Sequence, residues 1–269
     1  MRSIDSHCHL DFEPLSKELE AVLGRAKAVG VEKFINIGSS MRGSERSLEI
    51  AENYPNVWAT VGLHPHDAES LMDFDGTMEK IRELASHDKV VAIGEVGLDY
   101  FDAESQGKVS CDVKESQKKL FLAQLEIAIE KKLPIVFHVR DAWDDFFSII
   151  KNYKLKNLNY PKGVVHCFTG DEKIAKKAVD LGFYIGFTGF ITFDQPKFDH
   201  IREAAKTTPL EKIIVETDAP FLAPEPYRGK PNEPAYVIEV IKKLAEMRNI
   251  SAKEIANITA ANTEKLFKI

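Results

Sequence analysis

The sequence predicts an α/β protein, a TIM (β/α)8 barrel with its functional side chains at the C-terminal ends of the strands. Short, β-rich runs recur along the chain and alternate with helical patterns, which is typical of βαβ units and a parallel sheet. Several runs are apolar on both faces, as strands are when helices cover both sides of a parallel sheet. Polar side chains follow these runs at their ends. A doubly wound open sheet is the alternative architecture.

The predicted strands are residues 3–10, 33–38, 57–62, 90–95, 134–139, 163–168, 183–187 and 212–217. Two of them contain segments without any polar residue, Val90-Val91-Ala92-Ile93 and Ile213-Ile214-Val215, which indicates burial on both faces. The chain length of 269 residues is typical of one barrel built from about eight such units.

Two segments between the strands carry apolar residues at helical spacing. The first comprises Phe121, Leu125, Ala128 and Ile129, and the second comprises Val237, Val240, Ile241 and Leu244. Asp141 and Asp171 are predicted N-caps of the helices that follow them. Ser251 together with Glu254 forms a capping-box pattern, which predicts a last helix over residues 252–261.

No linker, low-complexity segment or change in composition divides the chain, so we expect residues 1–269 to form a single barrel domain. The one long irregular stretch is 98–113, which is polar and contains Gly107. Because this stretch follows Glu95 closely, it has two interpretations. It is either a lid over the strand ends or a plain surface insertion.

Composition limits the compartment and the class of partner. A net charge of -6 argues against a general polyanion binder, so a nucleic-acid substrate would need a local basic patch or bound cations. Cys8, Cys111 and Cys167 are an odd number without disulfide spacing, which indicates a reducing compartment. No signal-peptide pattern and no membrane-spanning apolar run occur. We therefore expect a cytoplasmic monomer, or a nuclear one in a eukaryote, without membrane association.

Histidine and carboxylate side chains gather at the predicted strand ends. As residues i and i+2 of an extended strand, His7 and His9 face the same side. Only His87 and His200 lie away from strand ends. The remaining candidates follow the third, fourth, fifth, sixth and eighth strands: His64 and His66, then Glu95, His138, His166 and Asp218. Because strand ends converge in a barrel, these residues predict a divalent-metal site.

The candidate ligands predict two metal ions. The first and last strands become neighbours when a barrel closes, so their side chains are expected to hold one ion: His7, His9 and Asp218. His138 and His166 come from adjacent strands and are expected to hold the second ion. Glu95, with two oxygens, is the predicted bridge. Imidazole and carboxylate ligands suit zinc, manganese or iron, and magnesium when water and substrate oxygens complete the shell.

No other nucleophile system is visible in the sequence. There is no G-x-S-x-G elbow and no P-loop lysine motif. No G-x-G-x-x-G motif follows the first strand, so we expect no nucleotide cofactor. Water activated by the metal ions is therefore the expected nucleophile.

Seven segments together carry a resemblance to a known family. They are Ile4-Asp5-Ser6-His7-Cys8-His9-Leu10-Asp11, Gly62-Leu63-His64-Pro65-His66, Gly94-Glu95-Val96-Gly97-Leu98-Asp99-Tyr100, His138-Val139-Arg140-Asp141-Ala142, His166-Cys167-Phe168-Thr169-Gly170, Glu216-Thr217-Asp218-Ala219-Pro220 and Tyr227-Arg228-Gly229-Lys230-Pro231-Asn232. This ordered set resembles the TatD family of metal-dependent deoxyribonucleases, within the amidohydrolase-like metal barrels. Any one segment is a weak signal, whereas the set is specific and spans most of the chain.

The resemblance implies a two-metal hydrolase, using Mg, Mn or Zn, that cleaves phosphodiester bonds of DNA, often from the 3′ end of a strand. In the family's pattern the ligands are the His-x-His pair, the glutamate, the two later histidines and the final aspartate, which agrees with the six residues assigned above. The pattern also places His64 near the scissile phosphate. Residues 102–113 make this stretch longer than is usual in the family, which leaves the shape of the substrate groove open.

On this hypothesis three residues are catalytic. Asp218 is a ligand that also accepts a proton from the attacking water, or alternatively a ligand only. Glu95 bridges the ions. His64 donates to a phosphate oxygen as negative charge develops, or alternatively makes a structural hydrogen bond.

The candidate substrate contacts are His64, His66, Arg140, Arg228 and Lys230. Arg140 is expected either to clamp a phosphate or to pair with a carboxylate at the rim. The other two basic residues lie in a loop rich in proline and glycine, where they either follow a nucleic-acid backbone or remain solvated.

We expect particular roles for four further residues. Glu216 and Asp5 lie one layer deeper than Asp218 and His7 on the same strand faces, so both are expected to support the ligands. Tyr100 and Phe101 are expected either to stack on bases or to pack against the protein.

Two alternatives to a deoxyribonuclease remain open at the level of sequence. One is a deacylase or amidohydrolase of the same barrel type, acting on an ester or amide such as a misaminoacylated tRNA. The same metal-activated water would serve that reaction. The other is a metal-holding scaffold without turnover, against which the complete ligand set argues.

Overall fold

The sheet follows the chain order of a barrel. The computed structural model describes residues 2–102, 107–156 and 162–269. Its eight-stranded sheet has the order β1-β2-β3-β4-β7-β8-β9-β10, and neighbouring strands in this order pair in parallel. The strands are β1 Ser3–Cys8, β2 Val31–Asn36, β3 Val57–Val61, β4 Val90–Asp99, β7 Ile135–Arg140, β8 Gly163–Val165, β9 Tyr184–Phe187 and β10 Ile213–Val215. This topology confirms the predicted TIM barrel and excludes the doubly wound alternative.

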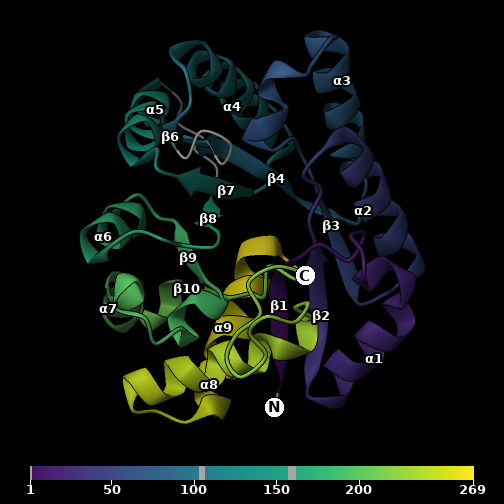
Figure 1. The fold of residues 1–269 in the computed structure, drawn as a ribbon. Coiled ribbons are helices and arrows are strands. Elements are labelled where there is room, and N and C mark those ends of the chain that lie inside the picture. Colours follow the sequence, from purple (N-terminus) through teal and green to yellow (C-terminus); the bar gives the residue numbers. More distant parts are fainter. Residues whose placement is uncertain (1, 103–106, 157–161) are drawn as a thin grey trace.

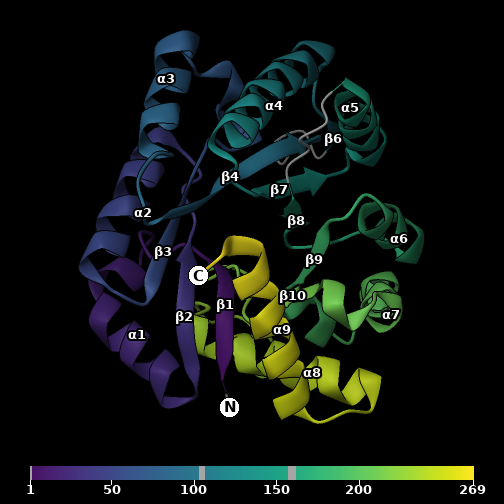
Figure 2. The same cartoon turned by 180° about the vertical axis from the view of Figure 1, so that it is seen from behind.

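Helices lie outside the strands in both views, except for the last helix, α9, which lies near the centre beside β1 (Figures 1 and 2). The α-helices are α1 Leu19–Ala28, α2 Met41–Asn53, α3 Phe74–Leu84, α4 Cys111–Lys131, α5 Trp143–Lys156, α6 Glu172–Asp180, α7 Asp199–Thr207, α8 Val237–Arg248 and α9 Ala252–Phe267. Short 3-10 helices are η1 Leu15–Lys17, η2 Pro65–Glu69, η3 Gly189–Thr192, η4 Pro196–Phe198, η5 Leu210–Lys212 and η6 Pro234–Tyr236. None of the helices within the described ranges is long and apolar enough to cross a membrane.

The first and last strands meet beyond the end of β10. The main-chain nitrogen of His9 donates to the oxygen of Ala219 at 2.7 Å, and that of Asp218 donates to the oxygen of His7 at 2.9 Å. A parallel bridge joins Cys8 to Ala219. Backbone contacts of predicted ligand residues therefore close the barrel at the C-terminal ends of its strands.

Two hydrophobic clusters fill the molecule. The larger one lies between the strands and the surrounding helices. The smaller one takes buried side chains from β2, β4, β7, β8, β9 and β10, so it occupies the interior of the barrel. Leu266 and Phe267 of α9 belong to this interior cluster. Glu264, in the same helix, accepts a hydrogen bond from Lys33 near the start of β2, so α9 covers the N-terminal end of the barrel. The opposite end is left for the functional site.

The predicted helix signals have mixed outcomes. Asp171 caps α6 as expected, because its carboxylate accepts from the main-chain nitrogens of residues 173 and 174. The Ser251 side chain accepts from the nitrogen of Glu254 as expected, although α9 continues past residue 261 to Phe267. The prediction for Asp141 is wrong. Helix α5 begins at Trp143, and Asp141 adopts a φ of 54°, outside the extended region of an N-cap residue.

The predicted irregular stretch 98–113 is largely ordered structure. Strand β4 runs on to Asp99, β5 (Phe101–Asp102) pairs antiparallel with β6 (Gly107–Lys108), and α4 begins at Cys111. These elements were not predicted from the sequence, because the end of β4 and the start of α4 contain polar residues that are typical of loops. Residues 103–106 lie outside the described ranges, and a lid function stays a prediction.

Gly97 is the residue that lets β4 pass close to β7. Its φ is +154°, and a β-carbon at this position would lie 1.9 Å from the main-chain oxygen of His138. Any side chain here would therefore push apart the two strands that carry Glu95 and His138.

We predict that Gly97→Ala lowers the free energy of unfolding by more than about 1 kcal/mol, because alanine is strained at this φ and meets backbone. The matched control is Gly24→Ala in α1, where a β-carbon meets nothing within 4 Å. The control is expected to stabilise the helix by about 0.5–1 kcal/mol. Urea unfolding of the two variants measures both effects, and equal midpoints would contradict the assignment of strain to Gly97.

Candidate metal centre

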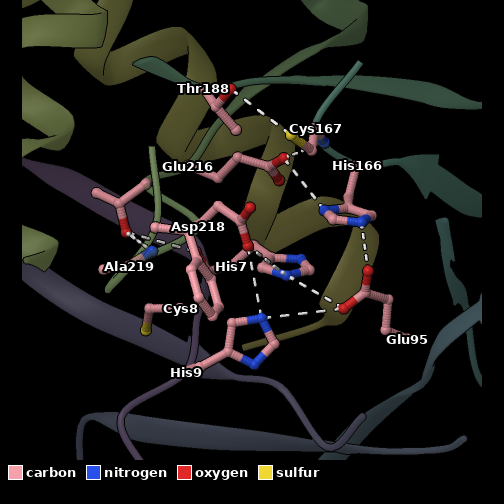
Figure 3. A network of polar contacts seen from close by, with 12 residues as sticks. His7, Cys8, His9, Glu95, His166, Cys167, Thr188, Glu216, Asp218 and Ala219 are labelled. Carbon is pink, nitrogen blue, oxygen red and sulfur yellow. Dashed lines mark hydrogen bonds and ion pairs between the residues drawn. The ribbon is translucent and has the colours of Figure 1, made fainter. Parts of the chain in front are cut away.

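The six predicted ligands converge at the C-terminal end of the barrel. His7 lies in β1, Glu95 in β4 and His138 in β7. His9 and His166 directly follow β1 and β8, and Asp218 is the third residue after β10. Figure 3 shows the side chains of His7, His9, Glu95, His166 and Asp218 pointing toward one another, although they come from distant parts of the sequence.

The Glu95 carboxylate lies at the centre of this cluster. Its side chain is only 6% exposed. Oε2 lies 3.7 Å from His7 Nε2 and 3.9 Å from His9 Nε2, whereas Oε1 lies 2.6 Å from His166 Nε2 and 2.7 Å from His138 Nδ1. Each oxygen therefore faces a different pair of histidines, which is the arrangement expected of a bridging ligand.

The first pair of histidines shares a second carboxylate. Asp218 Oδ1 lies 3.4 Å from His7 Nε2 and 3.5 Å from His9 Nε2. Burial, together with the neighbouring His166, holds the pKa of His7 well below its usual value, so its imidazole is neutral and able to ligate a metal. Both ring nitrogens of His7 are buried and have no hydrogen-bond partner.

This geometry fits a metal ion. Ions bound at about 2.0–2.2 Å hold adjacent donor atoms roughly 3.0–3.6 Å apart, which is close to the separations between Asp218 and the two histidines. An unpartnered buried nitrogen is costly unless something binds it. The donor set of imidazole and carboxylate is also the one that divalent transition metals prefer.

The second pair of histidines, His138 and His166, also brings positive charge to Glu95. Burial alone would lower the pKa of His138, but hydrogen bonds to the Asp99 and Glu95 carboxylates raise it to about 9. Burial would raise the pKa of Glu95, whereas His166 and His138 bring it well below its usual value. In the absence of a metal, a proton on His138 therefore compensates the buried carboxylate, and a bound cation would replace that proton.

His64 and His66 lie beside the second pair. The His64 and His138 ring centroids are 4.4 Å apart. His64 Nδ1 accepts a hydrogen bond from the main-chain nitrogen of His66 at 3.2 Å. Burial, with His138 nearby, keeps the pKa of His64 well below its usual value, so the ring is neutral and carries its proton on Nε2. That nitrogen lies 3.8 Å from Glu95 Oε1.

Asp99 is a site residue that the sequence analysis missed. Its Oδ2 lies 3.0 Å from His138 Nε2 and 3.2 Å from His66 Nε2. A carboxylate on the far nitrogen of a candidate ligand fixes the orientation of the ring and raises its basicity. The signal was present, since Glu95, Gly97 and Asp99 alternate along one strand. The predicted strand ended at residue 95, which hid that periodicity.

Four groups of side chains within the described ranges bring at least three ligand atoms within 4.8 Å of one another. The groups are His7, His9 and Glu95; His7, His166 and Asp218; His64, Glu95 and His138; and His64, His66 and Asp99. Together they contain all six predicted ligands. The sequence analysis had placed His64 and His66 at the substrate rather than at a metal.

Buried polar residues support the cluster from below. The Thr217 main-chain nitrogen and hydroxyl donate to Asp5 at 2.9 and 2.6 Å, and burial raises the pKa of Asp5 to about 7. Glu216 accepts from the main-chain nitrogen of Cys167 and lies 3.8 Å from His166 Nδ1 (Figure 3). Both carboxylates occupy the deeper layer that the strand spacing predicted. Cys167 itself contacts Thr188 through its sulfur.

The predicted basic contacts are exposed at the rim. The Arg140 guanidinium lies 3.9 Å from the centroid of the Phe101 ring. Arg228 donates to Gln195 Oε1 at 2.9 Å, and its guanidinium lies 4.0 Å from the Phe193 centroid. Lys230 is exposed. Neither arginine forms an ion pair with a carboxylate of the described residues, which argues against a rim salt bridge for Arg140.

The two aromatic residues after β4 have different environments. Tyr100 is buried, and its hydroxyl donates to Asp145 at 2.7 Å, which favours the packing interpretation. Phe101 is partly exposed beneath the Arg140 guanidinium.

A parallel α/β barrel with a cluster of histidines and carboxylates at the C-terminal strand ends defines a metal-dependent hydrolase. Comparison with known proteins specifies the family. The sequence model of the family described as TatD related DNase matches residues 4–268. The chain belongs to this family.

Relatives with similar lengths support this membership. The chain is 39% identical over 265 residues to an uncharacterized metal-dependent hydrolase, YabD, of Bacillus subtilis, with 98% of both chains covered. It is 36% identical over 269 residues to the 3'-5' ssDNA/RNA exonuclease TatD of Escherichia fergusonii, again with 98% of both covered. The crystal structure of YJJV, a TatD homologue from Escherichia coli K12, has a TM-score of 0.88 and 36% identity, covering 100% of this chain and 98% of that one.

We predict that Glu95→Gln removes most bound metal, because both groups of histidines lose their shared negative ligand. Asp99→Asn is expected to lower metal affinity by roughly 10- to 100-fold, because its role is to orient and polarise His138. The matched control is Asp180→Asn, a surface residue of α6 paired with Lys176. Elemental analysis after dialysis against a graded chelator measures all three variants. Metal retention equal to wild type in Glu95→Gln would exclude a bridging role.

Proposed function

We propose that this protein is a metal-dependent exonuclease that hydrolyses phosphodiester bonds at a strand end of DNA, most readily from the 3′ end. The observation that carries the proposal is the division of the Glu95 carboxylate, with one oxygen toward His7 and His9 and the other toward His138 and His166. Such a division suits two divalent ions, Mg, Mn or Zn. The whole chain would act as one hydrolase domain, as a monomer in the cytoplasm.

The ligands would be His7, His9 and Asp218 for one ion, His138 and His166 for the other, and Glu95 for both. When bound, two divalent ions supply a strongly acidified water and neutralise charge that develops on phosphate oxygens. A phosphodiester gains negative charge on its non-bridging oxygens during attack, so positive and donor groups around it lower the barrier.

Two side chains would move or hold protons. Asp218 would accept the proton of the attacking water, since its carboxylate is only 14% exposed and its Oδ1 lies 3.4 Å from His7 Nε2 and 3.5 Å from His9 Nε2. His64 donates from Nε2 to a phosphate oxygen. The tautomer supports this role, because Nδ1 is already occupied by the His66 main-chain nitrogen. A ring protonated on Nε2 is a donor rather than a ligand.

Substrate binding would use the exposed rim. Arg140 and Arg228 each present a guanidinium already oriented by an aromatic ring, which reduces the entropy lost when a phosphate is bound. Lys230 adds a third positive charge in the loop after β10, and His66 lies at the edge of the metal cluster. These local charges offset the chain's net charge of -6.

The exonuclease relative from E. fergusonii supports DNA over an ester or amide substrate. Because metal-activated water serves both reactions, a direct assay decides between them. A 5′-labelled single-stranded oligonucleotide and an aminoacyl-tRNA are each incubated with the protein and Mg²⁺, Mn²⁺ or Zn²⁺. We expect stepwise loss of the 3′ nucleotide and no metal-dependent deacylation. Deacylation without release of nucleotides would overturn the proposal in favour of the amidohydrolase alternative.

We predict that replacing Arg228 and Lys230 together with alanine weakens DNA binding and flattens its salt dependence. Two lost phosphate contacts on a single strand should reduce the slope of log(kcat/KM) against log[salt] by about 1.4. The matched control carries Lys253→Ala and Lys265→Ala, which removes the same charge from the exposed surface of α9. If both double variants share the wild-type slope, the loop after β10 does not contact the substrate.

A further inference from the structure

An exposed aromatic side chain lies beside the metal cluster. Phe221 is 49% exposed. The exposed large hydrophobic side chains among the described residues also include Val29, Met72 and Leu122, of which none is aromatic. A single exposed apolar side chain is ordinary on a protein surface. Phe221 differs from the other three in its position beside the candidate metal ligands.

Phe221 follows the candidate ligand Asp218 by three residues, and its ring faces two others. Its centroid lies 6.0 Å from that of His9 and 6.0 Å from that of Phe12. Phe12 and His9 are 4.9 Å apart. Phe12 is itself only partly buried. Two phenylalanines therefore border a ring that belongs to the metal cluster.

The backbone that carries Phe221 is fixed. Its main-chain nitrogen donates to the oxygen of Asp218 at 2.8 Å, and its oxygen accepts from Asn232 Nδ2. Asn232 is fully buried and also donates to the oxygen of Thr217 at 2.8 Å. On the other side, the Phe12 nitrogen donates to the oxygen of His9 at 3.1 Å. A ligand that stacks here does not have to order the backbone first.

We propose that the Phe221 ring, with the Phe12 ring set edge-to-face beside it at 88°, is a stacking platform for one unpaired nucleobase of the strand whose phosphate occupies the metal cluster. This proposal rests on the proposed nuclease function and specifies its substrate. The Phe221 ring supplies the flat surface, and the perpendicular Phe12 ring borders it. A nucleotide joins a flat base to a phosphate, and here an exposed aromatic ring lies beside the candidate metal ligands. Every base has a π face, so the platform is tolerant of sequence.

The platform favours a strand end that is not paired. In a duplex, neighbouring bases cover both faces of an internal base, whereas an unstacked base has a free face to place on Phe221. A stacking role for Phe221 would therefore agree with the single-stranded substrate in the name of the E. fergusonii relative.

The test compares Phe221 variants on oligonucleotides with and without the relevant base. The substrates are a single-stranded oligothymidylate and two copies that carry an abasic residue, one at the 3′-terminal position and the other at the next position. Variants are Phe221→Ala, Phe221→Leu and Phe221→Trp, and Leu122→Ala on the outer helix α4 is the control for loss of an exposed apolar side chain.

We expect Phe221→Ala to raise KM for the intact strand at least roughly fivefold with little change in kcat, in line with the loss of one stacked base. Phe221→Leu should behave like alanine, Phe221→Trp should restore wild-type KM, and Leu122→Ala should have no effect. On one of the two abasic substrates, wild type and Phe221→Ala should have the same KM.

Two results would overturn the platform. One is an unchanged KM in Phe221→Ala on the intact strand. The other is a rise in the KM of Phe221→Ala, relative to wild type, that is equally large on both abasic substrates. Phe221 would then have a structural role. Failure of the broader proposal has a different signature, because wild-type protein with metal would then release nucleotides from none of the three substrates.

Discussion

The buried carboxylate of Glu95 is the constraint around which the C-terminal end of the barrel is organised. Five histidine rings place a nitrogen within 4 Å of its two oxygens. A carboxylate removed from water is costly unless cations or donors surround it. Histidines from β1, β7 and the segments after β1, β3 and β8 meet this requirement. Any arrangement of these strands that separated them would leave both the carboxylate and the imidazoles without partners.

Closure of the barrel and construction of the site depend on the same backbone contacts. The hydrogen bonds between residues 7–9 and 218–219 join the first strand to the last. They also fix the backbone of His7, His9 and Asp218, the candidate ligands of the first ion. Asp5 reinforces this junction by accepting from Thr217, and Asn232 ties the following loop to it. The metal ligands, the rim aromatic Phe221 and the barrel seam are therefore parts of one rigid unit, which suits a site that must hold a substrate in a fixed position.

The patterns in the sequence differ in how well they predict the structure. Short β-rich runs located every strand of the barrel, because most of these strands are covered on both faces and are therefore rich in apolar residues. The prediction at Asp141 was wrong because an aspartate before a helix resembles an N-cap whatever its backbone angle. Asp99 was missed because the strand was ended at the first charged residue, whereas a buried charge at a functional site is compatible with a continuing strand.

The sequence by itself determined the barrel class, the order of its units and the six candidate ligands, because hydrophobic periodicity and residue chemistry are local properties of the chain. Only the tertiary structure decided which oxygen of Glu95 faces which histidines, that Asp99 orients His138, that His64 carries its proton on Nε2, and that Phe221 stays exposed beside His9. The His64 proton follows from a hydrogen bond to His66, two positions along the chain. The other properties depend on contacts between residues far apart in the sequence, where side-chain direction follows from packing and hydrogen bonding rather than from spacing along the chain.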